Sequence, residues 1–250
     1  MLATFDSHIF WEALSSRPYW HGALLALELT CLTLVAATVL AFFLALGKLS
    51  RFRSLRGIVL VYNWFFRAIP TLLLLLFVWN GLPQLWSVFT GNWYKAFLAA
   101  FIALALNEAA YMSEIIRAGL ISVDPGQELA ARALGMTRAQ ILRRVIVPQA
   151  VRIIIPPTAN EFITLLKLTS LASVISLYEL LGASTVRGSQ DFRYLEAYAA
   201  AAVYYLAIVS VLMAIQAQLE RRFTWSSTGR RRQRRVVVAP AVPAGPHDAR

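Results

Sequence analysis

Charged side chains lie inside long apolar runs of this 250-residue chain, where they could bind a polar solute or pair with one another. A charge in a membrane interior costs about 2.5–3.5 kcal/mol on insertion scales, so such residues mark a functional path or an ion pair. The ionisable candidates are Glu28, Arg67, Glu108, Glu114, Glu161 and Lys167.

The strongest group of candidates surrounds Glu161. The spacing of Asn160, Thr164 and Lys167 places them on one face of a helix, and Glu161 is adjacent to that face. A carboxylate at this depth could attract an ammonium group, which makes Glu161 the sharpest candidate.

Asn107 and Glu108, in an earlier apolar run, are weaker candidates for the same role. Polar groups at such depths either pack helices together or line a polar path, and we favour the path. Glu114 and Arg117 are three residues apart, and we predict that they form an intrahelical ion pair.

Prolines are expected to shape the helices that carry these residues. Pro156 and Pro157 remove two backbone donors just before Asn160, which predicts a disturbed helix with exposed carbonyls. Pro70 follows Arg67 and predicts a kink in another apolar run.

Other kinds of chemistry find no support in the sequence. The three histidines lie near the chain ends without metal-ligand spacing, so no metal site is predicted. Gly47-Lys48 lacks a phosphate loop, because Phe42 and Leu49 occupy positions where that motif needs Gly and Ser or Thr. We therefore expect a chain that is not an enzyme and does not hydrolyse a nucleotide by itself.

The composition indicates an integral membrane protein. The chain is 58% hydrophobic and 15% charged, with a mean hydropathy of +0.59. The net charge of +11 could suggest nucleic acid as a partner. The basic residues cluster between apolar runs, however, which is typical of cytoplasmic loops, so no nucleic-acid partner is expected.

Five apolar runs are long enough to cross a membrane, at residues 22–46, 62–82, 94–116, 151–177 and 195–219. Arg and Lys enrich the connections after the first and third runs, whereas residues 83–93 contain neither. This asymmetry places the N-terminus in the periplasm and the C-terminus in the cytoplasm. We divide the chain into a periplasmic segment (1–21), a membrane domain (22–223) and a basic tail (224–250) that we predict to be disordered.

The polar loop at 123–148 is predicted to form two short helices. Asp124 caps the first, Pro125 begins it and Gln127 completes a capping box. Gly135 ends it in a left-handed conformation, and a second helix runs from Thr137 to 148. The pair could lie on lipid or form a rigid knob that a partner protein contacts.

This loop resembles the EAA loop of permease subunits of ATP-binding-cassette importers. Leu129 stands where that family has Glu, and the only acid lies one place earlier, at Glu128, which turns the carboxylate by about 100° around the helix. The matching residues are Ala130, Ala131, Gly135, Val145, Val147 and Pro148.

The resemblance extends from residue 22 to residue 223 and is specific to the polar-amino-acid branch. Residues 65–70, FFRAIP, are similar to its FFRGTP signature, and residues 111–119 resemble the end of its third span. Residues 160–163, NEFI, and 165–171, LLKLTSL, are similar to its NEFI and LLKDTSL, with Leu168 in place of Asp.

The resemblance implies an all-α type I importer permease with five transmembrane helices in the bacterial inner membrane. It implies a substrate path along Asn107, Glu108, Asn160, Glu161, Thr164 and Lys167, and structural roles for Arg67, Pro70 and Pro148. The residues implied in ATPase coupling are Glu128, Leu129, Ala130, Ala131, Arg132, Gly135, Met136 and Thr137.

The implied partners are two copies of an ATPase subunit, an identical or sister permease, a periplasmic amino-acid-binding protein and the lipid bilayer. ATP would be used by the partner ATPase, and this chain would bind no cofactor. The implied substrate is a polar amino acid such as glutamate or aspartate. The alternative is a membrane channel or sensor whose cytoplasmic loop contacts lipid or a signalling partner.

Overall fold

The computed structural model describes residues 5–233, and it describes side chains as far as residue 223. The described residues form helices and connecting turns without a strand. In chain order the elements are α1 (Ser7–Ser15), α2 (Arg17–Lys48), α3 (Arg53–Ala68), α4 (Thr71–Leu76), η1 (Phe77–Gly81), α5 (Leu82–Leu85), η2 (Ser87–Thr90), α6 (Ala96–Ile121), α7 (Pro125–Ala133), α8 (Arg138–Ile141), η3 (Leu142–Ile146), α9 (Val147–Leu168), η4 (Thr169–Ile175), α10 (Leu180–Asp191) and α11 (Tyr194–Gln233).

The structure confirms an all-helical membrane protein. In the described residues, 3 helices are long and apolar enough to cross a membrane alone, namely α2, α6 and the part of α11 up to Phe223. Counting each of two bent pairs of helices as one span raises this number to 5. The prediction of five spans is compatible with this range, while the orientation of the chain stays a prediction.

The second predicted span turns much more sharply than a kinked helix. The helices Arg53–Ala68 and Thr71–Leu85 meet at 101°, with Pro70 at the corner. The prediction of a kink was therefore too mild. Ile69 and Pro70 both adopt extended backbone conformations, so the chain leaves the helical path completely at this point.

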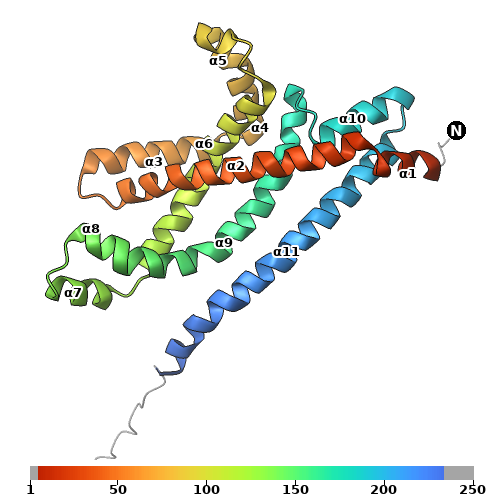
Figure 1. Ribbon diagram of the computed structural model, residues 1–250. Coiled ribbons are helices and arrows are strands. Elements are labelled where there is room, and N and C mark those ends of the chain that lie inside the picture. Colours follow the sequence, from red (N-terminus) through yellow and green to blue (C-terminus); the bar gives the residue numbers. More distant parts are fainter. Residues whose placement is uncertain (1–4, 234–250) are drawn as a thin grey trace, which may run out of the picture.

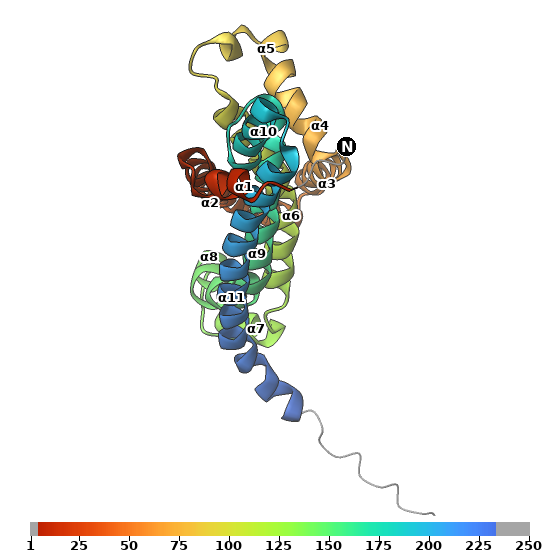
Figure 2. The same cartoon turned by 90° about the vertical axis from the view of Figure 1, so that its right-hand side faces the viewer.

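Three helices organise the molecule. A fourth long helix, α11, joins them: in Figure 1, α2 crosses α6 and α9, while α11 runs diagonally on the far side of α9. Figure 2, turned by 90°, shows α6, α9 and α11 running along one direction and α2 passing across them. The buried positions of α2 and α6 are rich in alanine, and small residues allow close backbone approach where lipid supplies no hydrophobic driving force.

The N-terminal residues pack onto the start of α11. The first long helix begins at Arg17, before the predicted start at residue 22, and α1 precedes it. The hydroxyl of Tyr204 donates to the carbonyl of Leu14 at 2.7 Å, and the hydroxyl of Tyr19 donates to the carbonyl of Ala197 at 3.0 Å. The predicted periplasmic segment is thus attached to the membrane domain.

The tail differs from its prediction where the structure describes it. α11 continues to Gln233, so residues 224–233, predicted as disordered, prolong a helix. Arg and Gln are good helix formers, and extending an existing helix requires no new nucleus. The remainder of the predicted tail, residues 234–250, lies outside the described residues.

The loop at 123–148 forms the two helices that the sequence predicts. Gly135 has φ 77°, and the capping box forms between Thr137 and Gln140 at the start of α8. The capping box predicted with Gln127 is wrong, because the side chain of Asp124 accepts from the backbone N–H of Gly126 at 2.8 Å instead.

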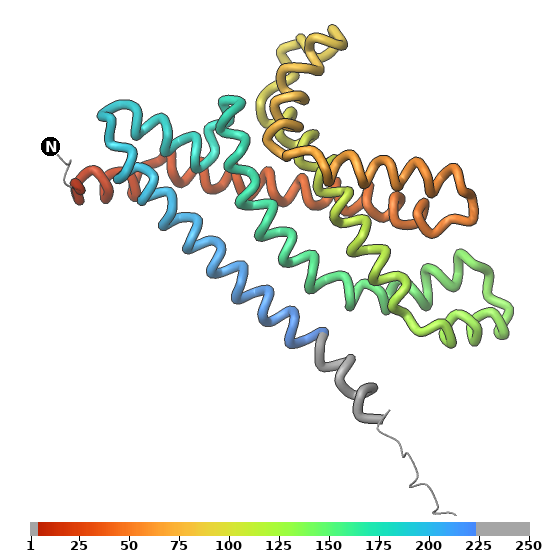
Figure 3. The backbone as a smooth tube through the Cα atoms, turned by 180° about the vertical axis from the view of Figure 1, so that it is seen from behind, coloured from red at the N-terminus to blue at the C-terminus, as the bar shows by residue number. Residues whose placement is uncertain are grey.

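The second helix of the loop does not end at Pro148 as predicted. α8 passes through the π-turn η3 directly into α9, so that residues 138–168 follow one helical path, which begins at the lower right of Figure 3. Pro148 is the second residue of α9. Its missing N–H is tolerated there because the wide π-turn has already interrupted the regular hydrogen-bond ladder.

Contrary to the prediction, Pro156 and Pro157 do not interrupt the helix that contains them. Both prolines lie inside α9, which continues without a break. By helix geometry, the carbonyls of Arg152 and Ile153 still lack the backbone donors that these prolines cannot supply.

Candidate functional site

Glu108 on α6 and Glu161 on α9 belong to two helices that pack against each other. Glu108 is 2% exposed, and its Oε1 atom is buried without a hydrogen-bond partner in the part of the chain that the structure describes. Glu161, on α9, is half-buried. Sequence reasoning selected both residues as candidates.

Asn107 has a different environment from its neighbour Glu108. Its Nδ2 atom donates to the carbonyl of Phe66 at 2.6 Å. In a continuous helix that carbonyl would accept from residue 70, which is Pro70 and has no N–H. The amide of Asn107 is therefore engaged in closing the end of α3.

The residues of the predicted group around Asn160 differ in exposure and in their contacts. Asn160 and Lys167 are exposed, and Thr164 donates its hydroxyl to the carbonyl of Asn160 at 3.2 Å. Lys167 borders a groove of about 420 Å³ between α9 and α11. The other residues that line this groove are Ser170, Ala202, Tyr205, Leu206 and Val209. Lys167 thus lies toward α11.

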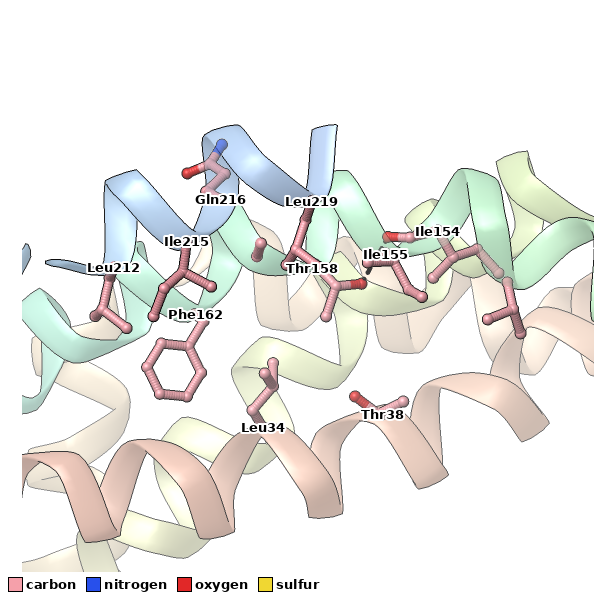
Figure 4. Close-up of a pocket in the computed structure, with 12 residues that line it drawn as sticks. Leu34, Thr38, Ile154, Ile155, Thr158, Phe162, Leu212, Ile215, Gln216 and Leu219 are labelled. Atoms are coloured by element: carbon pink, nitrogen blue, oxygen red, sulfur yellow. Dashed lines mark hydrogen bonds between the residues drawn. The ribbon is translucent and has the colours of Figure 1, made fainter. Parts of the chain in front are cut away.

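A larger cavity, of about 490 Å³, separates α2 from α9 and α11 (Figure 4). Most of the side chains in this view are aliphatic or aromatic, such as Leu34, Phe162 and Leu212. The hydroxyl of Thr158 is bonded to the carbonyl of Ile154 at 2.9 Å. No charged side chain lines the cavity, so it offers nothing that would orient an ionic solute.

A polar cluster joins α2, α3 and α6 around Glu114. Its carboxylate pairs with Lys48, and it accepts from Arg117 Nε at 3.0 Å and from Asn63 Nδ2 at 3.0 Å. The predicted intrahelical pair with Arg117 is confirmed. Sequence reasoning missed Lys48 and Asn63, although a lone asparagine in the apolar α3 was a usable signal.

Arg67, at the end of α3, stacks on an aromatic ring of α6. Its guanidinium carbon lies 5.1 Å from the ring centroid of Tyr111, a geometry suited to a cation–π contact. Arg67 itself is exposed. Together with the hydrogen bond from the hydroxyl of Tyr62 to the carbonyl of Leu106 at 2.8 Å, this contact holds α3 against α6.

The loop helices present an apolar surface that stands away from the membrane domain. Leu129 is 67% exposed and Leu134 is 81% exposed, while Ala131 faces inward. Glu128 pairs with Arg132 on its own helix, so the displaced acid stays within the loop. Exposed leucines on a polar, rigid loop are typical of a surface that another molecule covers.

Comparison with known proteins identifies the family of the chain. Residues 37–225 match the model of the binding-protein-dependent transport system inner membrane component. The chain belongs to this family. It is accordingly a multi-pass protein of the inner membrane, as the sequence predicted.

Characterised relatives cover most of the chain. The arginine transport system permease protein ArgU of Corynebacterium glutamicum is 38% identical over 235 residues, which are 90% of this chain and 72% of that protein. The octopine transport system permease protein OccM of Rhizobium radiobacter is 37% identical over 240 residues, which are 94% of this chain and 96% of that protein.

Solved structures agree with the fold of this permease. A crystal structure of an amino acid ABC transporter with histidines matches with a TM-score of 0.76 and 37% identity, covering 89% of this chain and 100% of that chain. The inward-facing MetNI methionine ABC transporter matches with a TM-score of 0.70 and 18% identity, covering 88% of this chain and 99% of that chain. The second likeness concerns the fold alone.

Proposed function

We infer that this permease translocates a polar amino acid into the cell as the membrane subunit of an ATP-driven importer. The observation that carries this conclusion is the single helical path from α8 through η3 into α9. That path connects the exposed loop to the helix that bears Glu161. Movement of the loop therefore moves the helix that bears Glu161 relative to α6.

The loop is the surface on which a separate ATPase subunit acts. Its exposed leucines and its glycine corner suit docking to a folded protein, and ATP is bound and hydrolysed by that partner. Two ATPase copies would move two permease subunits as rigid bodies, and a periplasmic binding protein would deliver the amino acid. This motion would give the permease two conformational states. Transport then requires that the substrate and the ATPase each bind one of these states more tightly than the other.

The second permease subunit, identical or sister, completes the path. Polar residues of α3, α6 and α9 such as Arg67, Tyr111 and Asn160 are exposed in the isolated chain. Polar side chains in a membrane segment face protein or water in preference to lipid. These exposed polar residues therefore support a second subunit that covers them.

Co-purification tests the proposal. The tagged chain, extracted from native membranes, is expected to bring down an ATPase subunit, and vesicles containing the complex should accumulate amino acids only with ATP and a periplasmic binding protein. A chain that purifies without an ATPase, and that passes solutes without ATP, would be a channel or sensor instead.

A further inference from the structure

We propose that the cavity between α2, α9 and α11 is a binding site for an anionic phospholipid. The acyl chains lie among the apolar side chains of the cavity, and the phosphate is bound by Arg152 and Arg222 at its end. The inference goes beyond the proposed function and does not depend on it.

The space for the acyl chains consists of two adjoining cavities. The larger, of about 490 Å³, lies between α2, α9 and α11 (Figure 4). The smaller, of about 350 Å³, lies between α2, α6 and α9 and shares Thr38, Val151 and Ile154 with the larger one. No charged side chain of the described residues lines either cavity. Hydrocarbon therefore suits this space better than water, which would find few polar partners there.

An arginine on α9 shares the helix face that lines the larger cavity. Arg152 comes three residues before Ile155 and seven before Ala159, both of which line the cavity. Residues at this spacing lie along one side of a helix. Arg152 is exposed, so its apolar stem can follow the cavity wall while its guanidinium stays at headgroup depth.

α11 carries a second arginine in a corresponding position. Arg222 comes three residues after Leu219 and seven after Ile215, which line the same cavity from α11. Arg152 stands at the start of the predicted span 151–177, and Arg222 stands just past the end of the predicted span 195–219. In Figure 1, the start of α9 and the C-terminal part of α11 both lie toward the loop helices, so the two arginines belong to the same end of the cavity.

These arginines are available to a ligand. Neither guanidinium has an ion-pair partner among the described residues, and the same holds for the exposed Arg221. The acid next to them in the chain, Glu220, accepts from Gln216 Nε2 at 3.0 Å. Three arginines against one carboxylate leave an excess of positive charge. A guanidinium can donate two parallel hydrogen bonds to a phosphate, and basic sites between membrane helices are typical of anionic headgroup binding.

The cavity and the arginines together select the ligand. A free phosphate ion would pair with the arginines but leave the cavity empty, and a neutral hydrocarbon would do the reverse. A zwitterionic lipid would bring its own cation close to the arginines, which lowers its affinity. A second copy of this chain is a poorer occupant, because the protein carries 24 basic residues against 13 acidic ones. An anionic phospholipid satisfies both parts of the site.

The test uses the full-length chain, purified in mild detergent with any subunits that accompany it and then stripped of bound lipid. Native mass spectrometry compares the binding of phosphatidylglycerol with that of phosphatidylcholine carrying the same acyl chains, and thermal melting measures the stabilisation. We expect phosphatidylglycerol to bind at least tenfold more tightly and to raise the melting temperature more. The double variant Arg152→Gln, Arg222→Gln should lose this preference.

The double variant Arg53→Gln, Arg56→Gln is the matched control, because it removes two exposed arginines of α3 and should keep the preference. Ala159→Leu occupies part of the cavity and should weaken phosphatidylglycerol binding severalfold, whereas Ala202→Leu, in the groove beside Lys167, should not.

Three results would overturn the inference. The first is equal binding of the two lipids by the wild-type protein. The second is a preference for phosphatidylglycerol that is unchanged by removing Arg152 and Arg222, or that is lost equally in the α3 control. The third is displacement of the lipid by inorganic phosphate with the same rise in melting temperature, which would show an ion site without a lipid.

Discussion

The side chain of Asn107 on α6 supplies the hydrogen bond that Pro70 cannot give to the carbonyl of Phe66. The Nδ2–O distance is 2.6 Å, and the chain turns by 101° immediately after this point. A helix can end abruptly inside a membrane only if its last carbonyls find other donors. One amide on a neighbouring helix thus permits the right-angled corner between α3 and α4.

Replacing Asn107 by Ala should lower the free energy of unfolding by about 1–3 kcal/mol, because the Phe66 carbonyl loses its donor in a buried place. Denaturation in detergent measures this change. Asn80→Ala is the control, since the Asn80 amide also donates to a backbone carbonyl, that of Leu76, but is exposed. If both substitutions have the same small effect, the corner does not depend on Asn107.

The dependence on Pro70 can be tested in a double-mutant cycle. Pro70→Ala restores a backbone N–H four residues after Phe66, so Asn107→Ala should cost less in that background than in the wild type. The quantity to compare is the difference between the two free energies of unfolding. Strict additivity would contradict the link between the two residues.

The Glu114 cluster should contribute more to stability than the exposed pair in the loop. Glu114→Gln weakens hydrogen bonds to charged donors on α2 and α6 in a partly buried site, and we expect a cost of about 1–3 kcal/mol. Glu128→Gln removes a surface pair with Arg132 and should cost less than about 0.5 kcal/mol. Thermal melting of both variants shows which substitution lowers stability more. A larger loss of stability for Glu128→Gln than for Glu114→Gln would contradict the prediction.

Gly135 should be needed for coupling ATP hydrolysis to uptake, but not for insertion of the chain into the membrane. Its φ of 77° disfavours a β-branched residue by about 1–2 kcal/mol or more, although space for a side chain is open. We expect Gly135→Val to reach the membrane while ATP hydrolysis no longer drives uptake. Gly57→Ala, which also has open space but lies in α3, is the control. Normal ATP-driven uptake by Gly135→Val would count against the coupling role of the loop.

Close contact between α6 and α9 should make Gly119 intolerant of a side chain. A Cβ atom there would lie 2.4 Å from Ile154 Cγ1, so Gly119→Ala must push the helices apart. Ile154→Ala removes that atom, and Gly119→Ala should therefore be less harmful in the Ile154→Ala background. Assembly with the ATPase and melting temperature are the measurements, and equal effects in both backgrounds would show that this contact is not limiting.

Residues within the loop were sufficient to predict its helix caps and its glycine corner. Gly135 adopts the left-handed conformation, and Asp124 and Thr137 cap the two helices, because these features depend on residues within a few positions. The end of the second helix was predicted wrongly at Pro148, since whether a proline stops a helix depends on the hydrogen-bond pattern before it. Here the π-turn η3 accommodates it.

Amino-acid sequence by itself determined the membrane class, the helical content, the family resemblance and the residues that deserve attention. It could not separate Asn107 from Glu108, adjacent residues that point about 100° apart, so that one closes α3 while the other is buried with an oxygen that has no partner among the described residues. It also could not show that Lys167 borders the groove toward α11. Only the packing of the helices decided these partners, because rotation and crossing are set by long-range contacts that local spacing does not contain.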